Sequence, residues 1–256
     1  MKIAILGSNG MVGQTMTKYL KDKYTVIEFG RQDYDIIKDP LPELSGFDYV
    51  INCIGLIKQK TNEKNNLFFD INSKFPHILT NNCERLIHIS SDCVFSGQLP
   101  YPASYSTVDP KDASDEYGQS KAQGEPGNAM ILRTSVIGPS QSGFGLFEWF
   151  KNTQNDPVNG YSNHWWSGVT TLELSKIVAN IIENGFYKHD LYQISGGAVS
   201  KLDLLVMINE IFSFNKNVKT YTDNQSINRT LTPTIKSSDI RTQLMDLKTW
   251  MDNEAC

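Results

Sequence analysis

Apolar residues recur at two different spacings along the first half of the chain. Short apolar runs bounded by turn residues are typical of buried strands. Longer stretches between them place apolar residues three and four positions apart, which is typical of helices packed on a core. We predict strands at residues 2–6, 24–29, 49–53, 86–89 and 130–133, and helices at residues 11–21, 67–83 and 114–123.

Strands that alternate with helices indicate an α/β fold, a Rossmann-like doubly wound parallel sheet covered on both faces. The helix at 67–83 should bend or break near Pro76, because proline lacks an N–H group. The second half is less regular, and no clear linker separates it from the first. There we predict helices at residues 144–151, 171–184 and 201–212 and a strand at 191–195.

The composition fits a folded enzyme better than a nucleic-acid or membrane protein. With 256 residues, of which 39% are hydrophobic and 20% charged, the chain can bury a core. Its net charge of -4 argues against a nucleic-acid partner. No apolar run approaches the ~20 residues of a membrane span, so we expect no membrane partner. The four cysteines show neither metal-binding spacing nor a disulfide framework, so we expect no metal and a cytoplasmic location.

A glycine-rich turn joins the first strand to the first helix. Gly7 permits a tight turn, Gly10 lets a pyrophosphate approach the backbone, and Gly13 lets helix and strand pack closely. The helix N-terminus adds unpaired N–H groups and a partial positive charge. The spacing is Gly-x-x-Gly-x-x-Gly, not the commoner Gly-x-Gly-x-x-Gly, and an ordinary strand-to-helix turn is the alternative. We predict a dinucleotide site that includes Gly7, Ser8, Asn9, Gly10, Met11, Val12 and Gly13.

The residues at the end of the second strand determine whether NAD or NADP fits the site. An acid there would hold the ribose 2′-hydroxyl of NAD, whereas an arginine would suit the 2′-phosphate of NADP. Gly30 leaves room at this point and Arg31 supplies a bidentate cation, so we favour NADPH. NADH remains the alternative, because Arg31 could be a solvated loop charge and Asp33 could serve NAD.

Tyr117 and Lys121 are four residues apart in a segment that we expect to be helical, so their side chains share one face. A lysine ammonium beside a phenol favours the phenolate and lowers its pKa. A tyrosine tuned in this way can exchange a proton with a carbonyl or alcohol oxygen near neutral pH. Alone the pair means little, because the same spacing is common on solvated helix faces.

Hydroxyl groups follow the strand at 86–89, at the sheet edge where ligands of parallel sheets bind. We expect Ser91 to face the site and to donate to a substrate carbonyl oxygen beside Tyr117. The alternative is that Ser90 and Ser91 cap the following turn. We predict that His88, in the middle of the strand, is structural.

An aromatic cluster in the second half has two interpretations. It could stack on a nucleotide base or a sugar, but we favour a role as lobe core or subunit contact. We select His164, within this segment, as a histidine that contacts the substrate. The cluster consists of Phe144, Phe147, Trp149, Phe150, Tyr161, Trp165 and Trp166.

In this set of motifs the chain resembles the extended short-chain dehydrogenase/reductase superfamily. Within the superfamily it is similar to the dTDP-4-dehydrorhamnose reductase branch, whose members reduce the 4-keto group of nucleotide-linked deoxysugars. The resemblance is clear over about 140 residues. The matching segments are 7–13, 30–31, 35–36, 52–55, 89–97, 117–121, 124–125 and 132–135, with a weaker match at 168–171.

The resemblance implies a role for each matched position. It implies a dinucleotide-binding core at residues 1–140, and at 141–256 a small substrate-binding lobe with elements that return to the core. Ser91, Tyr117 and Lys121 would be catalytic, and Lys121 would also hold the nicotinamide ribose. Further cofactor contacts would come from Asn52, Cys53, Ile54, Gly55 and Ser90, and substrate contacts from Asp92, Cys93, Phe95 and Arg133.

The chain also departs from the branch. Most members of the reductase branch have tyrosine where this chain has Cys93. The related 4,6-dehydratases have Asp-Glu at this place, because eliminating water needs extra acid and base groups. The sequence Asp92-Cys93 lacks that glutamate, which counts against dehydration.

These observations lead to one function and two alternatives. We predict an NADPH-dependent reductase of the 4-keto group of a nucleotide-activated deoxysugar, in the synthesis of cell-surface polysaccharide sugars. The expected partner is a nucleotide-sugar substrate, with a homodimer left open. The first alternative is a nucleotide-sugar epimerase or dehydrogenase that retains NAD. The second is a non-catalytic, nucleotide-binding regulatory subunit on the same fold.

Overall fold

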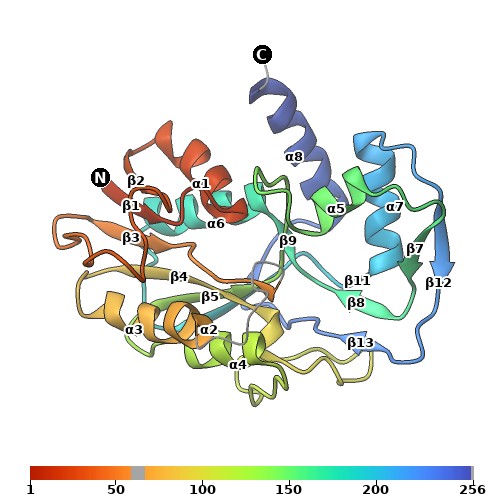
Figure 1. Cartoon of the computed structure of the whole chain (residues 1–256), viewed down its shortest axis with the longest axis horizontal. Helices are drawn as coiled ribbons and strands as arrows, with labels where there is room; N and C mark the ends of the chain where they lie inside the picture. Colours follow the sequence, from red (N-terminus) through yellow and green to blue (C-terminus); the bar gives the residue numbers. More distant parts are fainter. Residues whose placement is uncertain (59–66, 255–256) are drawn as a thin grey trace.

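A seven-stranded, fully parallel sheet forms the centre of the molecule in the computed structural model, which describes residues 1–58 and 67–254 (Figure 1). Its strand order, read from one edge, begins 2-1-3-4-5, as in a doubly wound sheet. The predicted α/β class and all six predicted strands are confirmed. In spatial order the strands are β2 (Thr25–Phe29), β1 (Lys2–Leu6), β3 (Tyr49–Asn52), β4 (Leu86–Ser91), β5 (Met130–Thr134), β10 (Leu191–Ser195) and β14 (Ile235–Lys236).

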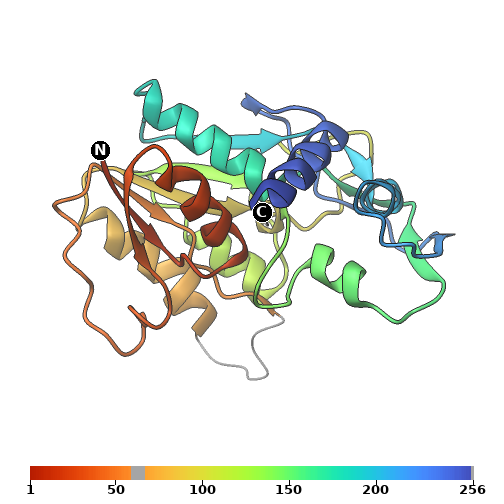
Figure 2. The ribbon, with the colours of Figure 1, turned by 90° about the horizontal axis from the view of Figure 1, so that it is seen from above.

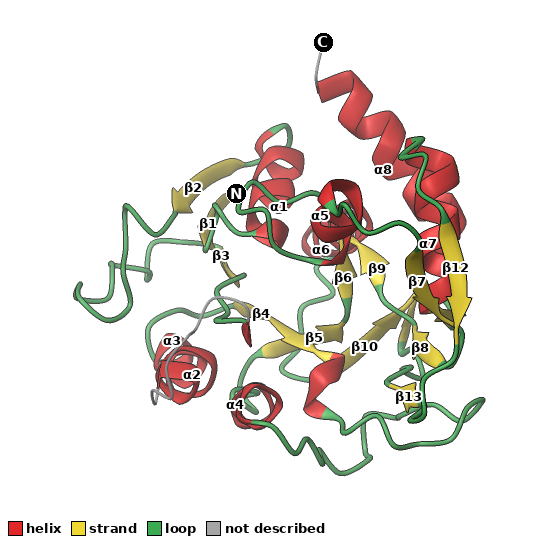
Figure 3. Cartoon of the chain, turned by 45° about the vertical axis from the view of Figure 1, so that its right-hand side comes forward, coloured by secondary structure: helices red, strands yellow, loops and turns green. Residues whose placement is uncertain are grey.

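Helices cover both faces of this sheet (Figures 1 and 3). Successive side chains of a strand point to opposite faces. In β1, Ile3 and Ile5 therefore pack in the cluster under one helical layer, and Ala4 and Leu6 pack in the cluster under the other. The first layer holds α1 (Met11–Lys21) and α6 (Thr171–Glu183), and the second holds α2 (Leu67–Phe69), α3 (Phe75–Thr80) and α4 (Glu116–Gln123).

The helix predicted at 67–83 is interrupted, as expected, but the interruption comes before the proline. A π-helical segment, Asp70–Lys74, separates α2 from α3. Pro76 lies in the first turn of α3, where its missing N–H group breaks no intrahelical hydrogen bond. The helix also ends at Thr80 and not at Cys83.

Much of the second half forms a lobe at one end of the sheet, whereas α6, β10 and β14 belong to the central layers (Figure 2). Its core joins α5 (Leu146–Asn152) and α7 (Lys201–Phe212) through Phe147, Phe150 and Trp166, so the core interpretation of the aromatic cluster is confirmed for these three residues. Short strands complete the lobe: β7 (Val158–Tyr161) with β12 (Val218–Tyr221), and β8 (His164–Trp166) with β11 (Val199–Ser200) and β13 (Ile227–Asn228).

Two connections return to the core. The pair β6 (Val136–Ile137) and β9 (Val169–Thr170) leads into α6. The last helix, α8 (Ile240–Glu254), contacts α6 and α7 through an apolar side that includes Leu244 and Leu247, and the sequence prediction missed it. In the part of the chain that the structure describes, no helix combines the length and apolar character needed to cross a membrane.

Candidate active site

A cavity of about 470 Å³ opens at the carboxyl ends of β1 and β3, where the strand order reverses. Open α/β sheets bind ligands at such switch points, because the connections on either side leave in opposite directions. The cavity therefore lies where a dinucleotide is expected. Seven of the residues predicted to bind the cofactor line it: Gly7, Asn9, Gly10, Arg31, Cys53, Ile54 and Gly55.

The glycine turn is tight enough to require its glycines. Gly7 has a φ of +80°, and its carbonyl accepts a hydrogen bond from the Gly10 N–H at 2.9 Å. A Cβ atom on Gly13 would lie 2.1 Å from the Gly7 carbonyl oxygen, so only glycine allows α1 to start so close to β1. Gly10 is the N-cap of α1, and no described side chain caps this end. The first-turn N–H groups are therefore available to an anion.

The loop after β2 presents an arginine at the rim of the cavity. The Arg31 side chain is 85% exposed, and its Nε atom lies 3.7 Å from a carboxylate oxygen of Asp35. Asp33 instead accepts a hydrogen bond from the Gly30 N–H at 2.9 Å, which stabilises the turn. In this arrangement Arg31 is free to reorient toward a phosphate, whereas Asp33 is already engaged.

Asn52 does not line the cavity but supports the loop after β3. This loop, residues 53–56, lines the cavity where a dinucleotide is expected and is called the cofactor loop. Oδ1 of Asn52 accepts from the Ile54 N–H at 3.0 Å, and its Nδ2 donates to Nδ1 of His88 at 3.0 Å. His88 is therefore a neutral acceptor, in line with burial lowering its pKa well below the ordinary value. Its Nε2 atom has no partner among the described residues. The structural role predicted for His88 agrees with this contact.

Asn72, in the π-helical segment, is a site residue that the sequence did not indicate. Its side chain accepts from the Leu56 N–H at 2.8 Å and donates to the Leu56 carbonyl at 3.0 Å. The same amide donates to Oγ of Ser120 in α4 at 3.1 Å. One buried side chain thus joins the cofactor loop to the helix that carries Tyr117. A single asparagine in a helical stretch carries no sequence signal of such a role.

Tyr117 lies beside Ser91 and Cys93. Asp115 is the N-cap of its helix α4, and the Asp115 carboxylate accepts from the Gly118 N–H at 3.0 Å. A Cβ atom on Gly118 would lie 2.4 Å from the Cys93 carbonyl oxygen, so the first turn of α4 packs directly on the segment after β4. Burial and the Cys93 thiol raise the pKa of Tyr117 above its ordinary value, and hydrogen bonding with Ser91 acts in the opposite direction.

Lys121 is buried, and its Nζ donates to the Ile89 carbonyl at 2.9 Å. Burial lowers the pKa of Lys121 to about 8, an effect that the carboxylate of Glu125 opposes. The expected lowering of the Tyr117 pKa is not found in this structure, because burial is the largest influence on the phenol and raises its pKa. The phenol is therefore held protonated, which suits a proton donor.

The two serines at the end of β4 have different partners. Ser91 Oγ accepts from the Cys93 N–H at 3.1 Å and donates to Asp92 at 3.2 Å, so it caps the short 3₁₀ turn Asp92–Val94 and also neighbours Tyr117. Ser90 Oγ points the other way and donates to Glu125 at 2.6 Å. The Ser90 hydroxyl is therefore engaged by Glu125, and the cofactor contact assigned to Ser90 stays a prediction.

Three predicted substrate contacts are engaged elsewhere. Phe95 is fully buried and stacks on Tyr105 with ring centroids 4.1 Å apart. Arg133, 1% exposed, forms an ion pair with Glu125, so neither side chain is placed to touch a ligand in this structure. His164 lies in the lobe, 3.3 Å from a carboxylate oxygen of Asp223. The substrate contacts assigned to Phe95 and Arg133 from the resemblance, and to His164 from the aromatic segment, stay predictions.

Lys201 enters the site from the lobe and was not predicted. It begins α7, and its Nζ lies 5.3 Å from the ring centroid of Trp166. Burial lowers the pKa of Lys201 to about 8, an effect that the neighbouring Asp92 and Cys93 oppose. Desolvation also raises the pKa of Asp92, against the influence of Arg229 and Lys201. The ammonium of Lys201 therefore lies near Asp92 and Cys93, which follow Ser91. Only tertiary packing brings these distant residues together.

Replacing Lys121 with Met is expected to stabilise the protein at pH 7. The Lys121 pKa is about 8 in the folded chain against 10.5 for an ordinary lysine, so folding disfavours the ammonium. This difference in pKa lowers the free energy of unfolding by about 3 kcal/mol below pH 8. The loss of stability disappears as the pH rises to about 10.5, because the unfolded chain then also loses the proton. Urea unfolding at pH 7 and pH 10 measures it. If K121M gained the same free energy of unfolding at both pH values, the Lys121 side chain would not be a buried charge at pH 7.

The comparisons with known proteins agree with this architecture. A family model described as the RmlD substrate binding domain matches residues 1–252. A dTDP-4-dehydrorhamnose reductase from Clostridium acetobutylicum is 22% identical, with a TM-score of 0.81 over 98% of this chain and 100% of that chain. No curated protein matches the chain by sequence.

Two further solved structures have the same fold with different cofactors. A dTDP-4-dehydrorhamnose reductase from Bacillus anthracis, in complex with NADP, is 17% identical, with a TM-score of 0.79 over 97% of this chain and 99% of that chain. A dTDP-glucose 4,6-dehydratase from Streptomyces venezuelae, with NAD bound, is 16% identical, with a TM-score of 0.76 over 99% and 97%. At these identities the likeness establishes the fold.

Proposed function

The chain belongs to the family described as the RmlD substrate binding domain, within the extended short-chain dehydrogenase/reductase superfamily, and from this premise we propose that it reduces the 4-keto group of a nucleotide-activated deoxysugar. The observation that carries the proposal is the position of Tyr117. Its protonated phenol lies beside Ser91, at the same edge of the sheet as the dinucleotide cavity. A proton donor beside a hydride source is the arrangement that carbonyl reduction needs.

The residues around the cavity fit a nicotinamide dinucleotide. The glycine turn brings bare backbone and the uncapped N-terminus of α1 to the place of the pyrophosphate. Cys53, Ile54 and Gly55 offer the wall after β3, and Arg31 lies at the rim. When bound, the nicotinamide supplies the hydride. We favour NADPH, since Arg31 is exposed and Asp33 is engaged with Gly30.

The residues of this chain then have distinct tasks. Tyr117 gives its phenolic proton to the oxygen of the ketone while the carbon receives hydride. The Ser91 hydroxyl turns from Asp92, to which it donates in this structure, and donates a hydrogen bond to the same oxygen, which positions the carbonyl. Lys121 places its ammonium near the nicotinamide ribose, which requires a small reorientation from the Ile89 carbonyl. The phenol of Tyr117 carries its proton at neutral pH, as a proton donor must.

The second-half lobe would hold the nucleotide-sugar substrate, with residues 1–140 as the dinucleotide-binding part. Lys201 and Asp92 approach Ser91 from the lobe side and from the 3₁₀ turn, so they are placed to contact the sugar. Cys93 takes the place of the tyrosine usual in the reductase branch and leaves a smaller side chain beside Tyr117. We therefore expect the sugar pocket to differ in shape from that of the branch.

A substrate screen tests the proposed function. The purified chain is mixed with NADPH or NADH and with dTDP-, UDP-, GDP- or CDP-linked 4-keto-6-deoxysugars, and cofactor oxidation is followed at 340 nm. We expect oxidation with at least one sugar, faster with NADPH than with NADH. Absence of oxidation with every sugar and both cofactors would refute the reductase proposal. Cofactor released on denaturation, if it were NAD, would favour the epimerase alternative.

A further inference from the structure

Glu125 lies just beyond the helix that carries Tyr117 and Lys121. It follows Lys121 by four residues and comes directly after the C-cap Gly124. These three side chains meet three consecutive residues of β4: Tyr117 lies beside Ser91, Lys121 donates to the Ile89 carbonyl, and Glu125 accepts from Ser90. The helix and the residue after its C-cap are thus joined to the end of β4 at three residues.

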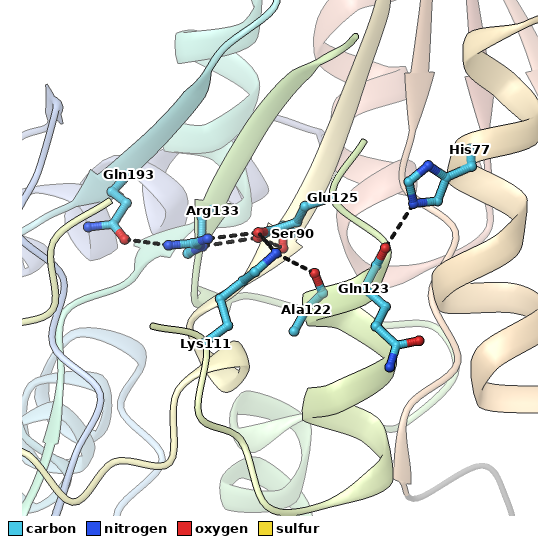
Figure 4. Close-up of polar contacts among 8 residues, drawn as sticks. All are labelled: His77, Ser90, Lys111, Ala122, Gln123, Glu125, Arg133 and Gln193. Atoms are coloured by element: carbon cyan, nitrogen blue, oxygen red, sulfur yellow. Dashed lines mark hydrogen bonds and ion pairs between the residues drawn. The ribbon is translucent and has the colours of Figure 1, made fainter. Parts of the chain in front are cut away.

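Glu125 is the centre of a buried polar network (Figure 4). Arg133 donates to it in a bidentate manner, from Nε to Oε1 at 3.0 Å and from Nη2 to Oε2 at 2.7 Å. Ser90 donates to Oε1 at 2.6 Å, and Lys111 Nζ lies 3.2 Å from Oε2. The Glu125 side chain is 5% exposed. A carboxylate with this many charge-assisted donors has a fixed position.

Arg133 is itself anchored to the rest of the sheet. It is the partner of Ser90 in the pairing of β4 with β5, and its Nη1 donates to Oε1 of Gln193 in β10 at 2.9 Å. Gln193 Nε2 in turn donates to the Tyr105 carbonyl at 2.8 Å. The guanidinium also lies 5.0 Å from the ring centroid of Phe95. The network therefore ties the end of α4 to three neighbouring strands.

The last carbonyls of α4 receive donors from both sides. Lys111 Nζ donates to the Ala122 carbonyl at 2.5 Å, and His77 Nε2 donates to the Gln123 carbonyl at 2.8 Å (Figure 4). Carbonyls at a helix C-terminus lack intrahelical partners, so hydrogen-bond donors there stabilise the helix end. Gly124 is tightly packed, because a Cβ atom there would lie 1.8 Å from the Asn72 carbonyl oxygen.

We propose that Glu125, held by Arg133, Ser90 and Lys111, is a positioning residue that fixes α4 against β4 and keeps the Lys121 side chain charged in the cofactor site. The inference rests on the proposed function in taking Lys121 as a cofactor-binding residue. Its test measures cofactor binding and needs no sugar, so the two fail separately.

The charge of Glu125 acts directly on Lys121. Burial would favour a protonated Glu125, but Arg133, Ser90 and Lys111 hold the pKa of this carboxyl below its ordinary value, so it is ionised at neutral pH. Its negative charge raises the pKa of Lys121, while burial lowers it to about 8. The Cys93 and Cys53 thiols, the other titratable groups that influence Lys121, have pKa values raised by burial to about 11 and about 12 and are neutral there. Glu125 is thus the anion that offsets burial of the ammonium.

The experiment follows the dissociation constant of NADPH from pH 6 to 10 by fluorescence. In the wild type we expect binding to weaken above about pH 8, since Lys121 loses its proton, and in K121M we expect this dependence to vanish. The pH at which binding begins to weaken is called the bend. In E125Q the bend should move about one pH unit lower, which is about fivefold weaker binding at pH 8. E125D keeps the charge and should restore most of the wild-type profile.

Glu148 offers a matched control, because it is also a buried carboxylate, bonded to the Ser140 N–H at 3.0 Å in the lobe. E148Q should leave the bend where it is. If E125Q does not fold, because Arg133 is left as an unpaired buried charge, the double variant E125Q/R133M removes both charges and should show the same lowered bend. An unchanged bend in these variants, an equal shift in E148Q, or no binding of NADPH by the wild type would overturn the proposal.

These results test the reductase function and the role of Glu125 independently of each other. A lowered bend in E125Q together with no reduction of any 4-keto sugar would refute the proposed function and leave the role of Glu125 intact. Reduction of a sugar together with an unchanged bend in E125Q would support the proposed function and refute the role of Glu125.

Discussion

Replacing Tyr117 with Phe is expected to lower the rate of sugar reduction by about a thousandfold, within the range for loss of a general acid. The substitution removes only the phenolic hydroxyl, and the ring keeps its edge contact with Phe68, with centroids 6.1 Å apart. The packing of α4 therefore stays intact, and so does the position of Lys121. The dissociation constant of NADPH should change less than about threefold, because the lost group serves the substrate oxygen.

Steady-state assays and NADPH fluorescence titrations check this result. Y192F is a suitable control, since Tyr192 lies in β10 with its side chain in the core under α6, away from Ser91. That variant should retain the wild-type rate. A wild-type rate in Y117F would show that Tyr117 is not the proton donor. Loss of NADPH binding in Y117F would show that the hydroxyl is needed for the structure of the cofactor site and not for proton transfer.

Replacing Gly13 with Ala is expected to weaken NADPH binding about a hundredfold, or about 2.7 kcal/mol, near the upper end of the cost of overpacking. The new Cβ atom would lie 2.1 Å from the Gly7 carbonyl oxygen and 2.9 Å from Cα of Ser8. Both contacts are with backbone, so the turn must move away from α1. The N–H groups that face the pyrophosphate move with it.

Fluorescence titration and thermal unfolding separate the effect on binding from an effect on folding. Gly46 provides the control, because a Cβ atom there meets nothing within 4 Å. G46A should bind NADPH as the wild type does. Wild-type affinity in G13A would mean that the turn adapts freely, and the glycine turn would then not be the pyrophosphate site.

Most of the first half of the fold was predictable because its signals are local. The run at residues 2–6, the helix at 11–21 and the glycines between them interact within a short stretch of chain, and β1 and α1 match the prediction. Except for β10, the strands of the second half were missed, because each is short and pairs with distant residues, as β12 does with β7. The helix α8 does carry apolar residues at Ile240, Leu244 and Leu247, a signal that was present and not used.

The candidate site divides in the same way. Tyr117 and Lys121 share a helix face by spacing alone, and Ser91 ends a strand that the pattern predicts. Their electrostatics could not be predicted, because the pKa of each group depends on burial and on partners that other segments bring. The sequence indicated that Lys121 would acidify Tyr117, whereas burial raises the pKa of Tyr117 and lowers that of Lys121.

The sequence by itself determined the class of fold, the dinucleotide turn and the positions of the catalytic candidates, because these depend on residue types at fixed spacings within single segments. The tertiary structure alone decided which way Ser90, Phe95, Arg133 and His164 point and which distant groups reach the site. Lys201 arrives from the lobe, Asn72 from a π-helical turn and Arg133 from a neighbouring strand. Such contacts join residues far apart in the chain, and only packing of the folded layers specifies them.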